Sequence, residues 1–258
     1  SIMSEALEMP TEIKSRVSEE EWKTREDLAA AYRLVAHYGW DDMVFTHLSA
    51  RVPGPDEHFL LNPFGVLFEE VTASSLVKID LDGAVVLDNG YQVNAAGFTI
   101  HSAIHGARED AQAVMHLHTD AGVAVSCIKE GFLPLNQHAM FVYHDVAYHD
   151  WEGVALNLDE RERLIADIKD RHLMMLRNHG TLAVGGSIAS CFMRLYFFER
   201  ACAIQAKAMN GNLHMPSDQA ILMMKETFNN PDSWEGIAAT AWPAMRRRAD
   251  RIDPSYTN

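Results

Sequence analysis

Three histidines in this sequence have the types and the spacing of a metal site. His116 and His118 lie two residues apart in the apolar run Val114-Met115-His116-Leu117-His118, where alternate side chains of a strand would share one face. His179 occurs in Asn178-His179-Gly180, a turn sequence between two short apolar runs. Three protein ligands with an open fourth position are typical of catalytic zinc sites. The sequence therefore predicts one divalent metal ion bound by His116, His118 and His179, with zinc favoured and manganese, cobalt or iron as alternatives.

Two further side chains are candidates for moving protons beside such an ion. His101 and His105 are four residues apart, so a helix would place them on one face, as a proton-transfer group or as a plain polar stripe. Tyr143 lies in the aromatic and histidine-rich run 137–149, whose alternation would equally suit a half-buried strand. We predict His101 and Tyr143 as the catalytic side chains.

The elements that must position these residues are indicated by changes in hydrophobic period. The expected helices, from apolar spacing and capping residues, cover 18–38, 94–108, 119–128, 158–170 and 187–209, with two more in the tail. The expected strands cover 43–49, 59–62, 76–80, 84–87, 113–118, 173–176 and 181–184, with an Asp82-Gly83 hairpin turn. This pattern predicts an α/β fold in which helices cover a sheet.

Composition excludes several classes of protein. The 258 residues carry a net charge of -14 spread along the chain, whereas a nucleic-acid binder would show a basic face. The three cysteines are widely spaced and odd in number, which favours reduced thiols over a disulfide framework. No apolar run approaches the length needed to cross a membrane. We expect a single-domain cytoplasmic protein that acts on a small molecule, with neither nucleic acid nor membrane as a partner.

Three segments in order resemble the class II aldolase/adducin family: His101-Ser102-Ala103-Ile104-His105, Val114 to Thr119, and Arg177-Asn178-His179-Gly180. The resemblance extends over roughly residues 25–210. It implies a largely antiparallel central sheet between helices, a three-layer sandwich, preceded by an N-terminal arm at 1–24 and followed by a helical extension at 211–258.

The resemblance also implies a homotetramer with sites at the subunit boundaries. The tail residues Trp234, Trp242 and Met245 would then close against a neighbour, or alternatively pack on their own subunit.

The chain departs from the family's pattern where sugar phosphates bind. The glutamate that serves the family as ligand and proton carrier falls at Gly97, so this chain resembles an adducin-like branch without it. The family's Gly-Asn pair becomes Thr46-His47, a threonine becomes Phe64, and a serine pair becomes Ala95-Ala96. We expect His47, Phe64, Gly65 and Gly97 to contact the substrate, and we expect that substrate to carry no phosphate.

The resulting hypothesis is a divalent-metal-dependent carbon–carbon lyase, an aldolase or a decarboxylase, working through a metal-stabilised enolate. One alternative is a non-catalytic, adducin-like interaction protein, which the loss of the carboxylate at Gly97 would suit. Another is an iron-dependent oxygenase on the same fold. The sequence alone names neither the substrate nor the group that replaces the missing glutamate.

Overall fold

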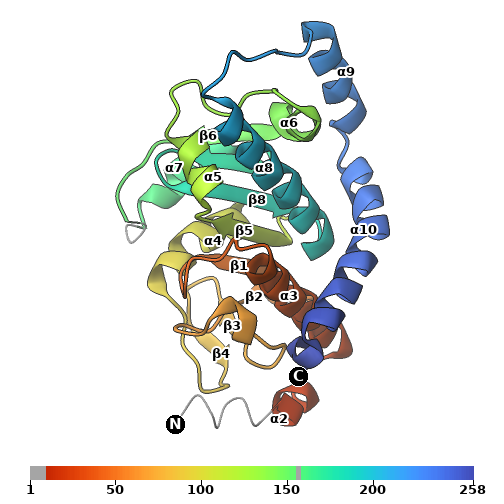
Figure 1. The fold of residues 1–258 in the computed structure, drawn as a ribbon. Coiled ribbons are helices and arrows are strands. Elements are labelled where there is room, and N and C mark those ends of the chain that lie inside the picture. Colours follow the sequence, from red (N-terminus) through yellow and green to blue (C-terminus); the bar gives the residue numbers. More distant parts are fainter. Residues whose placement is uncertain (1–9, 155–157) are drawn as a thin grey trace.

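The computed structural model describes residues 10–154 and 158–258, and within them one eight-stranded sheet runs through the molecule (Figure 1). The strand order is β4-β3-β2-β1-β5-β8-β7-β6, and every neighbouring pair is antiparallel except the parallel pair β6 and β7. The strands are β1 His47–Arg51, β2 His58–Leu61, β3 Val77–Asp80, β4 Val85–Leu87, β5 Ala113–Leu117, β6 Val146–His149, β7 Leu173–Leu176 and β8 Gly180–Gly185.

Helices cover both faces of this sheet and make it the middle of three layers. The helices are α2 Pro10–Ser15, α3 Glu19–His37, α4 Ala95–Ala107, α5 Asp120–Ser126, α6 Gln137–Val142, α7 Glu160–Ile168, α8 Ile188–Ala208, α9 Asp218–Phe228 and α10 Pro231–Ile252. Short 3-10 turns lie at Phe68–Glu70, Tyr143–Asp145 and Pro254–Thr257. The predicted α/β class and three-layer architecture are confirmed.

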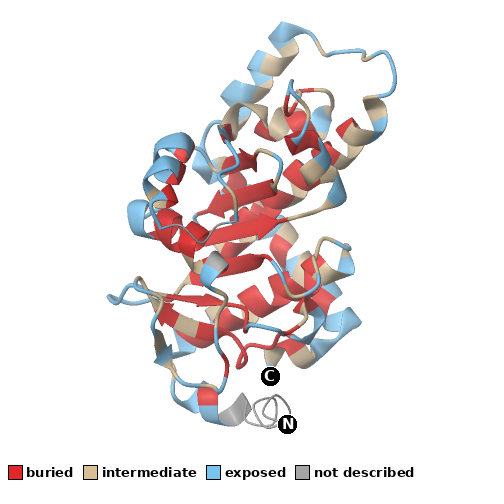
Figure 2. Ribbon diagram, turned by 90° about the vertical axis from the view of Figure 1, so that its left-hand side faces the viewer, coloured by how far each residue is buried: buried red, intermediate tan, exposed pale blue. Residues whose placement is uncertain are grey.

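Two apolar cores lie on opposite faces of the sheet. Met115 and Leu117 of β5 pack in the larger core with α3, α8 and α10, whereas Val114 packs in the smaller core with Ile100 of α4 and Leu164 of α7. Buried residues follow the sheet and its facing helices, and α9 is mostly exposed (Figure 2). This alternation along β5 places His116 on the same face as Val114, toward α4, as the sequence predicts.

Most expected elements agree with the structure to within a few residues. Ser18 caps α3, and its hydroxyl accepts the backbone N–H of Glu21 at 3.0 Å. The Asp82-Gly83 turn joins β3 and β4, with Gly83 at a φ of +84°. For the run 137–149, the interpretation as a half-buried strand is wrong for the first part, where Asn136 caps helix α6. It is right for Val146 to His149, which form β6.

The C-terminal extension packs on its own chain. Trp234 and Trp242 of α10 are buried, and their rings lie 5.4 Å from those of Phe197 and Phe192 of α8. Both tryptophan rings thus have apolar partners within their own chain. At the other end, residues 1–9 of the expected arm fall outside the described ranges, and the expected boundary at residue 25 falls inside α3. Among the described residues, no helix has the length and apolar character needed to cross a membrane.

Candidate metal centre

The three predicted ligands converge at the end of β5. His116 and His118 leave the strand on one face, and His179 lies in the turn between β7 and β8. The three ring centroids are 4.7, 4.8 and 4.8 Å apart, and one ligand atom from each ring lies within 4.8 Å of the others. The triad predicted from sequence is thus assembled as one cluster.

Close approach of two backbones brings His179 to the strand. Asn178 adopts a φ of +59°, which turns the chain back toward β5. A Cβ atom on Gly180 would lie 2.2 Å from the carbonyl oxygen of Leu117, so a larger residue would push the turn away. The Asn-His-Gly sequence therefore positions His179 through backbone geometry.

In His116 and His118, Nδ1 makes a hydrogen bond outside the cluster, which leaves Nε2 facing into the cluster. The Nδ1 of His116 donates to the carbonyl of Thr181 at 2.8 Å, and the Nδ1 of His118 lies 3.0 Å from Oδ2 of Asp42. A backbone carbonyl or a carboxylate behind an imidazole fixes the tautomer and the ring orientation of metal-binding histidines. The Nε2 atoms of His118 and His179 face each other at 2.9 Å, a spacing that suits two nitrogen ligands of one ion.

Burial keeps the rings of His116 and His179 neutral. Burial, followed by the neighbouring rings of His179 and His118, holds the pKa of His116 well below its ordinary value. Burial and His118 lower the pKa of His179 to about 4. Metal ligation requires unprotonated imidazole, so the donor set fits a divalent ion of the zinc, manganese, cobalt or iron type.

The triad opens into a cavity of about 490 Å³. Its walls come from the β1 region, α4, the triad and the loop after β6, and they comprise Asp42, Phe45, Thr46, His47, Asn94, Gly97, Ile100, His101, His116, His118, Trp151, Gly153, Val154 and His179. No lysine or arginine is among these described lining residues. The cavity combines a nitrogen-rich floor with apolar walls.

His101 sits at the end of a hydrogen-bond chain whose direction can be assigned. The Nδ1 of His105 lies 2.8 Å from the carbonyl of Ala111, which can only accept, so that nitrogen carries the hydrogen. The Nε2 of His105 then accepts from the hydroxyl of Ser49 at 2.6 Å, and that oxygen accepts from Nδ1 of His101 at 2.5 Å.

This series of hydrogen bonds leaves the Nε2 of His101 unprotonated, so that it can only accept a hydrogen bond. That atom is buried and has no hydrogen-bond partner among the described residues. Burial, and then the nearby His47 and His105, hold the pKa of His101 well below its ordinary value. His101 therefore borders the cavity with a neutral ring, and its unprotonated Nε2 is itself buried.

His47 fills the space beside Gly97. A Cβ atom on Gly97 would lie 2.4 Å from Cδ2 of His47, closer than real side chains approach. The Nδ1 of His47 is 2.7 Å from Oδ1 of Asn62, and burial is the main cause of its lowered pKa. Of the four expected substrate-contact residues, His47 and Gly97 line the cavity.

The other expected residues lie elsewhere in this chain. Phe64 is 58% exposed in the turn after β2, and neither it nor Gly65 lines the triad cavity, because the chain reaches the surface after the buried Pro63. Tyr143 begins the short 3-10 turn before β6, where its ring packs edge-on against His144, and it also lies outside the cavity wall. A catalytic role for Tyr143 therefore requires a second subunit.

Two acidic residues that sequence reasoning missed support the triad. Asp42 holds His118, as described above. Glu199 of α8 is buried and accepts the hydroxyls of Thr119 and Thr181, each at 2.5 Å, while burial raises its pKa. Thr119 directly follows His118, and Thr181 carries the carbonyl that holds His116, so Glu199 ties both strand ends together. The spacing of 42 and 199 from the histidines gives no sequence signal for either contact.

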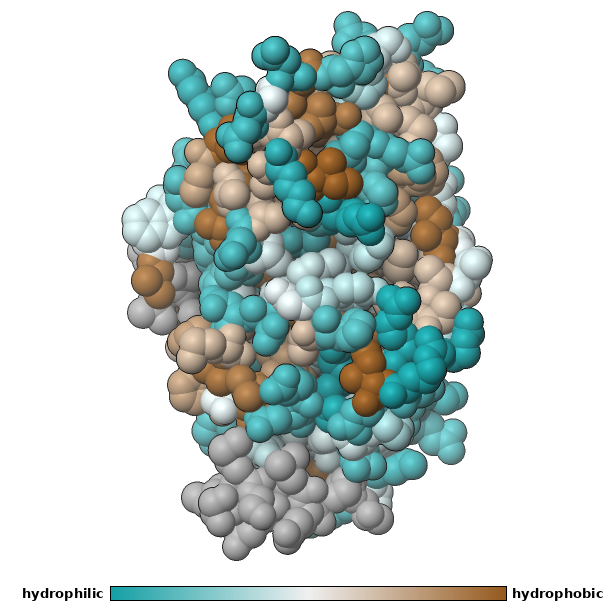
Figure 3. Space-filling model, viewed as in Figure 1, coloured by the Kyte–Doolittle hydropathy of each residue, from teal (hydrophilic) through white to brown (hydrophobic). Residues whose placement is uncertain are grey.

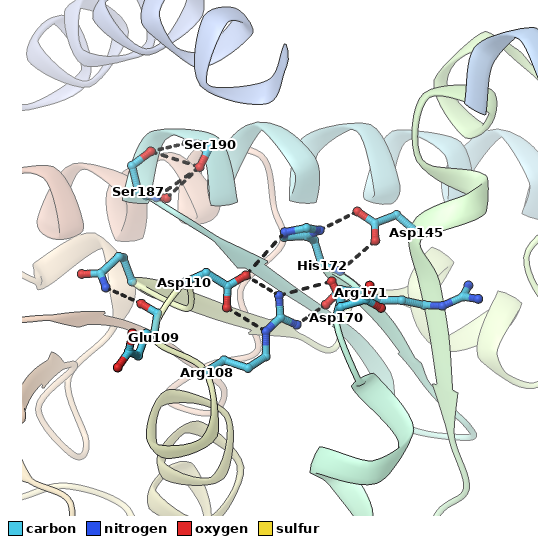
Figure 4. Close-up of polar contacts among 10 residues, drawn as sticks. Arg108, Glu109, Asp110, Asp145, Asp170, Arg171, His172, Ser187 and Ser190 are labelled. Carbon is cyan, nitrogen blue, oxygen red and sulfur yellow. Dashed lines mark hydrogen bonds and ion pairs between the residues drawn. The ribbon is translucent and has the colours of Figure 1, made fainter. Parts of the chain in front are cut away.

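A separate polar network closes the opposite end of the same strands (Figure 4). The guanidinium of Arg108 donates to both carboxylate oxygens of Asp110, at 3.0 and 2.7 Å. His172, just before β7, lies 2.8 Å from Asp145 and 3.9 Å from Asp110. These charges pair with one another at the start of β5 and β7, so His172 is a structural histidine remote from the triad.

Comparisons with known proteins agree with this geometry. The sequence profile described as Class II Aldolase and Adducin N-terminal domain matches residues 26–206. A Caulobacter vibrioides protein, whose name assigns it provisionally to the class 2 aldolases, is 53% identical over 97% of this chain and 98% of its own.

Two solved structures share the architecture. An aldolase II superfamily protein from Pseudomonas syringae has a TM-score of 0.90 and 48% identity, covering 96% of this chain and 100% of that one. An L-fuculose 1-phosphate aldolase from Glaciozyma antarctica PI12 has a TM-score of 0.81 and 28% identity, covering 92% of each chain. With a histidine cluster at the end of β5 and this fold around it, the chain belongs to the class II aldolase and adducin family.

Proposed function

We propose that the chain is a divalent-metal-dependent carbon–carbon lyase that acts on a non-phosphorylated carbonyl compound, by retro-aldol cleavage or by decarboxylation. One observation carries the proposal: three imidazoles that can bind an ion and a fourth, His101, with an unprotonated Nε2 border the same cavity. An interaction surface has no use for such a set of inward-facing nitrogens.

His116, His118 and His179 would hold the ion, with zinc favoured by the three imidazole ligands. When bound, the ion supplies Lewis acidity that polarises a substrate carbonyl. Asp42 and the Thr181 carbonyl orient the rings, and the buried Glu199 keeps the two strand ends in register. These supports are already in place, so the ligands need little rearrangement to bind.

Proton transfer falls to His101. In the retro-aldol direction, its Nε2 lone pair would take the hydroxyl proton of the substrate as the carbon–carbon bond breaks. The protonated ring would then return that proton to the carbon that has lost its partner. His47, at 5% exposure and with its Nδ1 committed to Asn62, would orient the substrate from the adjacent wall.

The cavity chemistry favours a substrate without phosphate. A phosphate dianion needs charged or multiple hydrogen-bond donors, whereas the described lining has Asp42 as an anion and no lysine or arginine. The side chains of Phe45, Ile100, Trp151 and Val154 add apolar surface. The Glaciozyma antarctica relative is named for a sugar phosphate, and we propose that this chain differs from it in substrate class.

We further propose a homotetramer in which the Tyr143 region of one subunit faces the cavity of the next. Apolar side chains are exposed on α9, where Leu222 is 52% and Met223 is 59% exposed. Hydrophobic surface gathers along α9 and the first part of α10 in the space-filling view (Figure 3). Such exposed apolar side chains are typical of surfaces that become buried on assembly.

The test is a turnover assay on purified protein loaded in parallel with Zn²⁺, Mn²⁺, Co²⁺ or Fe²⁺. The panel contains non-phosphorylated β-hydroxy carbonyl compounds, β-keto acids, and the 1-phosphates of fuculose and rhamnulose. We expect release of a carbonyl fragment or CO₂ from a non-phosphorylated compound, and its loss in His101→Gln.

Three outcomes would contradict the proposal. Efficient cleavage of either sugar phosphate would overturn the substrate class. Tight metal binding without turnover of any compound would favour an adducin-like interaction protein. Oxygen uptake confined to the iron-loaded protein would favour an oxygenase.

A further inference from the structure

A second group of metal-ligand side chains lies beside the triad. It comprises His149 at the end of β6, Glu152 in the following loop and Glu160 at the start of α7, with one ligand atom from each within 4.8 Å of the others. The Nε2 of His149 is 3.3 Å from Oε1 of Glu160 and 3.4 Å from Oε2 of Glu152. These three residues line a small cavity that His179 also borders, so the two ligand groups share a wall.

The hydrogen bond behind His149 directs a lone pair toward the two carboxylates. His149 is 5% exposed, and its Nδ1 lies 2.7 Å from Oδ2 of Asp167, which can only accept when ionised. In the neutral ring Nε2 is then unprotonated and faces two carboxylate oxygens. The nitrogen lone pair and the carboxylate oxygens repel one another, and either a proton on the ring or a cation between the three atoms removes that repulsion. A carboxylate behind a histidine is also the usual support of a metal-binding imidazole, and it stands apart from the two candidate oxygen ligands.

Nearby basic side chains neutralise Glu152 but not Glu160. Arg163, which is half exposed, contacts Oε1 of Glu152 at 2.6 and 2.7 Å and Oε2 at 2.9 Å. No lysine or arginine forms an ion pair with Glu160 or Asp167 in ranges 10–154 and 158–258. Glu160 is 7% exposed, and a buried carboxylate is costly without a cation. The cation of Arg177, which also lines the small cavity, lies over the Tyr148 ring and donates to the carbonyl of Ile128.

We propose that His149, Glu152 and Glu160 bind a second divalent cation, which anchors the loop between β6 and residue 154 against α7. One nitrogen and two carboxylate ligands suit Mn²⁺, Fe²⁺ or Zn²⁺. The same loop contributes Trp151, Gly153 and Val154 to the wall of the triad cavity. The second ion would therefore shape that wall through Glu152 while staying outside the triad itself.

The proposal does not depend on lyase activity, and binding alone tests it. In the double variant His116→Ala/His118→Ala the triad cannot hold an ion, so Mn²⁺ added to the full chain reports on the second group. We expect equilibrium dialysis with elemental analysis to give one bound Mn²⁺ per chain. Adding Glu160→Gln should abolish that binding. Glu162→Gln is the matched control, because it makes the same charge change on the exposed side of α7 and should leave binding unchanged.

A second ligand variant guards against a folding artefact. Glu152→Gln, in the loop, should also abolish Mn²⁺ binding while circular dichroism stays that of the parent. Two results would overturn the proposed site: no bound Mn²⁺ in the double variant, or equal Mn²⁺ binding with and without Glu160→Gln. The group would then be a protonated His149 paired with carboxylates.

Tryptophan fluorescence tests whether the second cation anchors the loop between β6 and residue 154. Mn²⁺ should change the tryptophan fluorescence of the double variant, and Trp151→Phe should remove most of that change. Binding of Mn²⁺ with no fluorescence response would contradict the anchoring of the loop.

Discussion

The ring of His47 occupies the space in which a side chain at Gly97 would begin. A Cβ atom at position 97 would lie 2.4 Å from Cδ2 and 2.7 Å from Nε2 of that ring. From the resemblance we expected the family's glutamate to correspond to this position; in the structure the glycine and the histidine ring fit each other here. The two residues therefore act as a pair in deciding what borders the triad.

Replacing Gly97 with alanine should destabilise the protein. We expect a loss of about 1–3 kcal/mol in the free energy of unfolding, because the added methyl group overpacks against a buried ring. Urea denaturation measures this, and Gly97→Ala should cost much less stability when it is added to His47→Ala than when it is added to the parent. Gly236→Ala is the control: no atom lies within 4 Å of its Cβ position inside α10, so alanine there should stabilise. A Gly97→Ala variant as stable as the parent would contradict the steric pairing.

The contact between His47 and position 97 also determines how a glutamate introduced at that position should affect metal affinity. Gly97→Glu alone must displace His47, so we expect it to leave metal affinity unimproved. His47→Asn/Gly97→Glu supplies both the carboxylate and the room for it, and we expect that double variant to bind Zn²⁺ more tightly than the parent in competition with a chelator. Equal affinity in the parent and the double variant would place position 97 away from the ion.

Much of the site follows from local sequence rules. Period-two alternation predicts that His116 and His118 share a face, and the Asn-His-Gly turn predicts His179 at a hairpin tip. What brings the three together is the pairing of β5 with β8, which sets Leu117 opposite Thr181. The spacing of the motifs along the chain does not specify that pairing.

The parts that sequence reasoning missed depend on contacts between distant segments. Asp42 and Glu199 lie 76 and 80 residues from their partners His118 and Thr119, and nothing in their local sequence distinguishes them from solvated carboxylates. The same limit applies to His149, whose alternating neighbours indicate a strand but not the carboxylates gathered around it. Phe64 was expected at the site from its position in a motif, yet the direction of the turn places it in solvent.

Ser49 should matter for catalysis without touching the substrate. Ser49→Ala removes the acceptor that holds the Nδ1 hydrogen of His101, so both tautomers of His101 become accessible. We expect kcat to fall about 10- to 100-fold with KM nearly unchanged, which is less than the roughly 10²- to 10⁴-fold that general acid–base catalysis contributes, because the His101 ring itself remains. Nitrogen NMR of the His101 ring should show a mixture of tautomers in place of one. Ser102 lies on α4 beside His101, and its hydroxyl donates to the carbonyl of Phe98. Ser102→Ala should therefore change neither kcat nor the tautomers of His101.

Acid should destabilise the metal-free protein through its buried histidines. Burial lowers the pKa of His105 and of His179 to about 4, below the ordinary value of 6.5. Between these values the unfolded chain binds protons that the folded chain does not, so stability falls as pH falls from about 6.5 to about 4. Above pH 6.5 the contribution is fully present.

The fully buried ring of His105 should contribute a loss of about 3 kcal/mol across this window, as an order of magnitude. His105→Gln should flatten the pH dependence of the urea midpoint, and His214→Gln, at an exposed position, should leave it unchanged. A midpoint that stays constant from pH 6.5 to 4 would contradict the neutral assignment of these rings.

Assembly and the role of Tyr143 are tested together. We expect a tetramer by analytical ultracentrifugation at micromolar concentration, weakened by Leu222→Glu. His116→Ala and Tyr143→Phe should each be inactive, and mixing followed by reassembly should restore part of the activity, because each cavity would then combine an intact triad with an intact neighbouring tyrosine. A monomer would refute the assembly, whereas a tetramer without complementation would remove Tyr143 from catalysis.

The central claim is that His116, His118 and His179 hold one divalent ion, and anomalous diffraction from crystals grown with Zn²⁺ tests it most directly. We predict a zinc peak between the three rings, about 2.0–2.1 Å from a nitrogen of each. The peak should vanish in His116→Ala, His118→Ala or His179→Ala, whose fold stays intact, and should persist in His214→Ala. Absence of zinc density at the triad in parent crystals, or an undiminished peak in any of the three variants, would contradict the account.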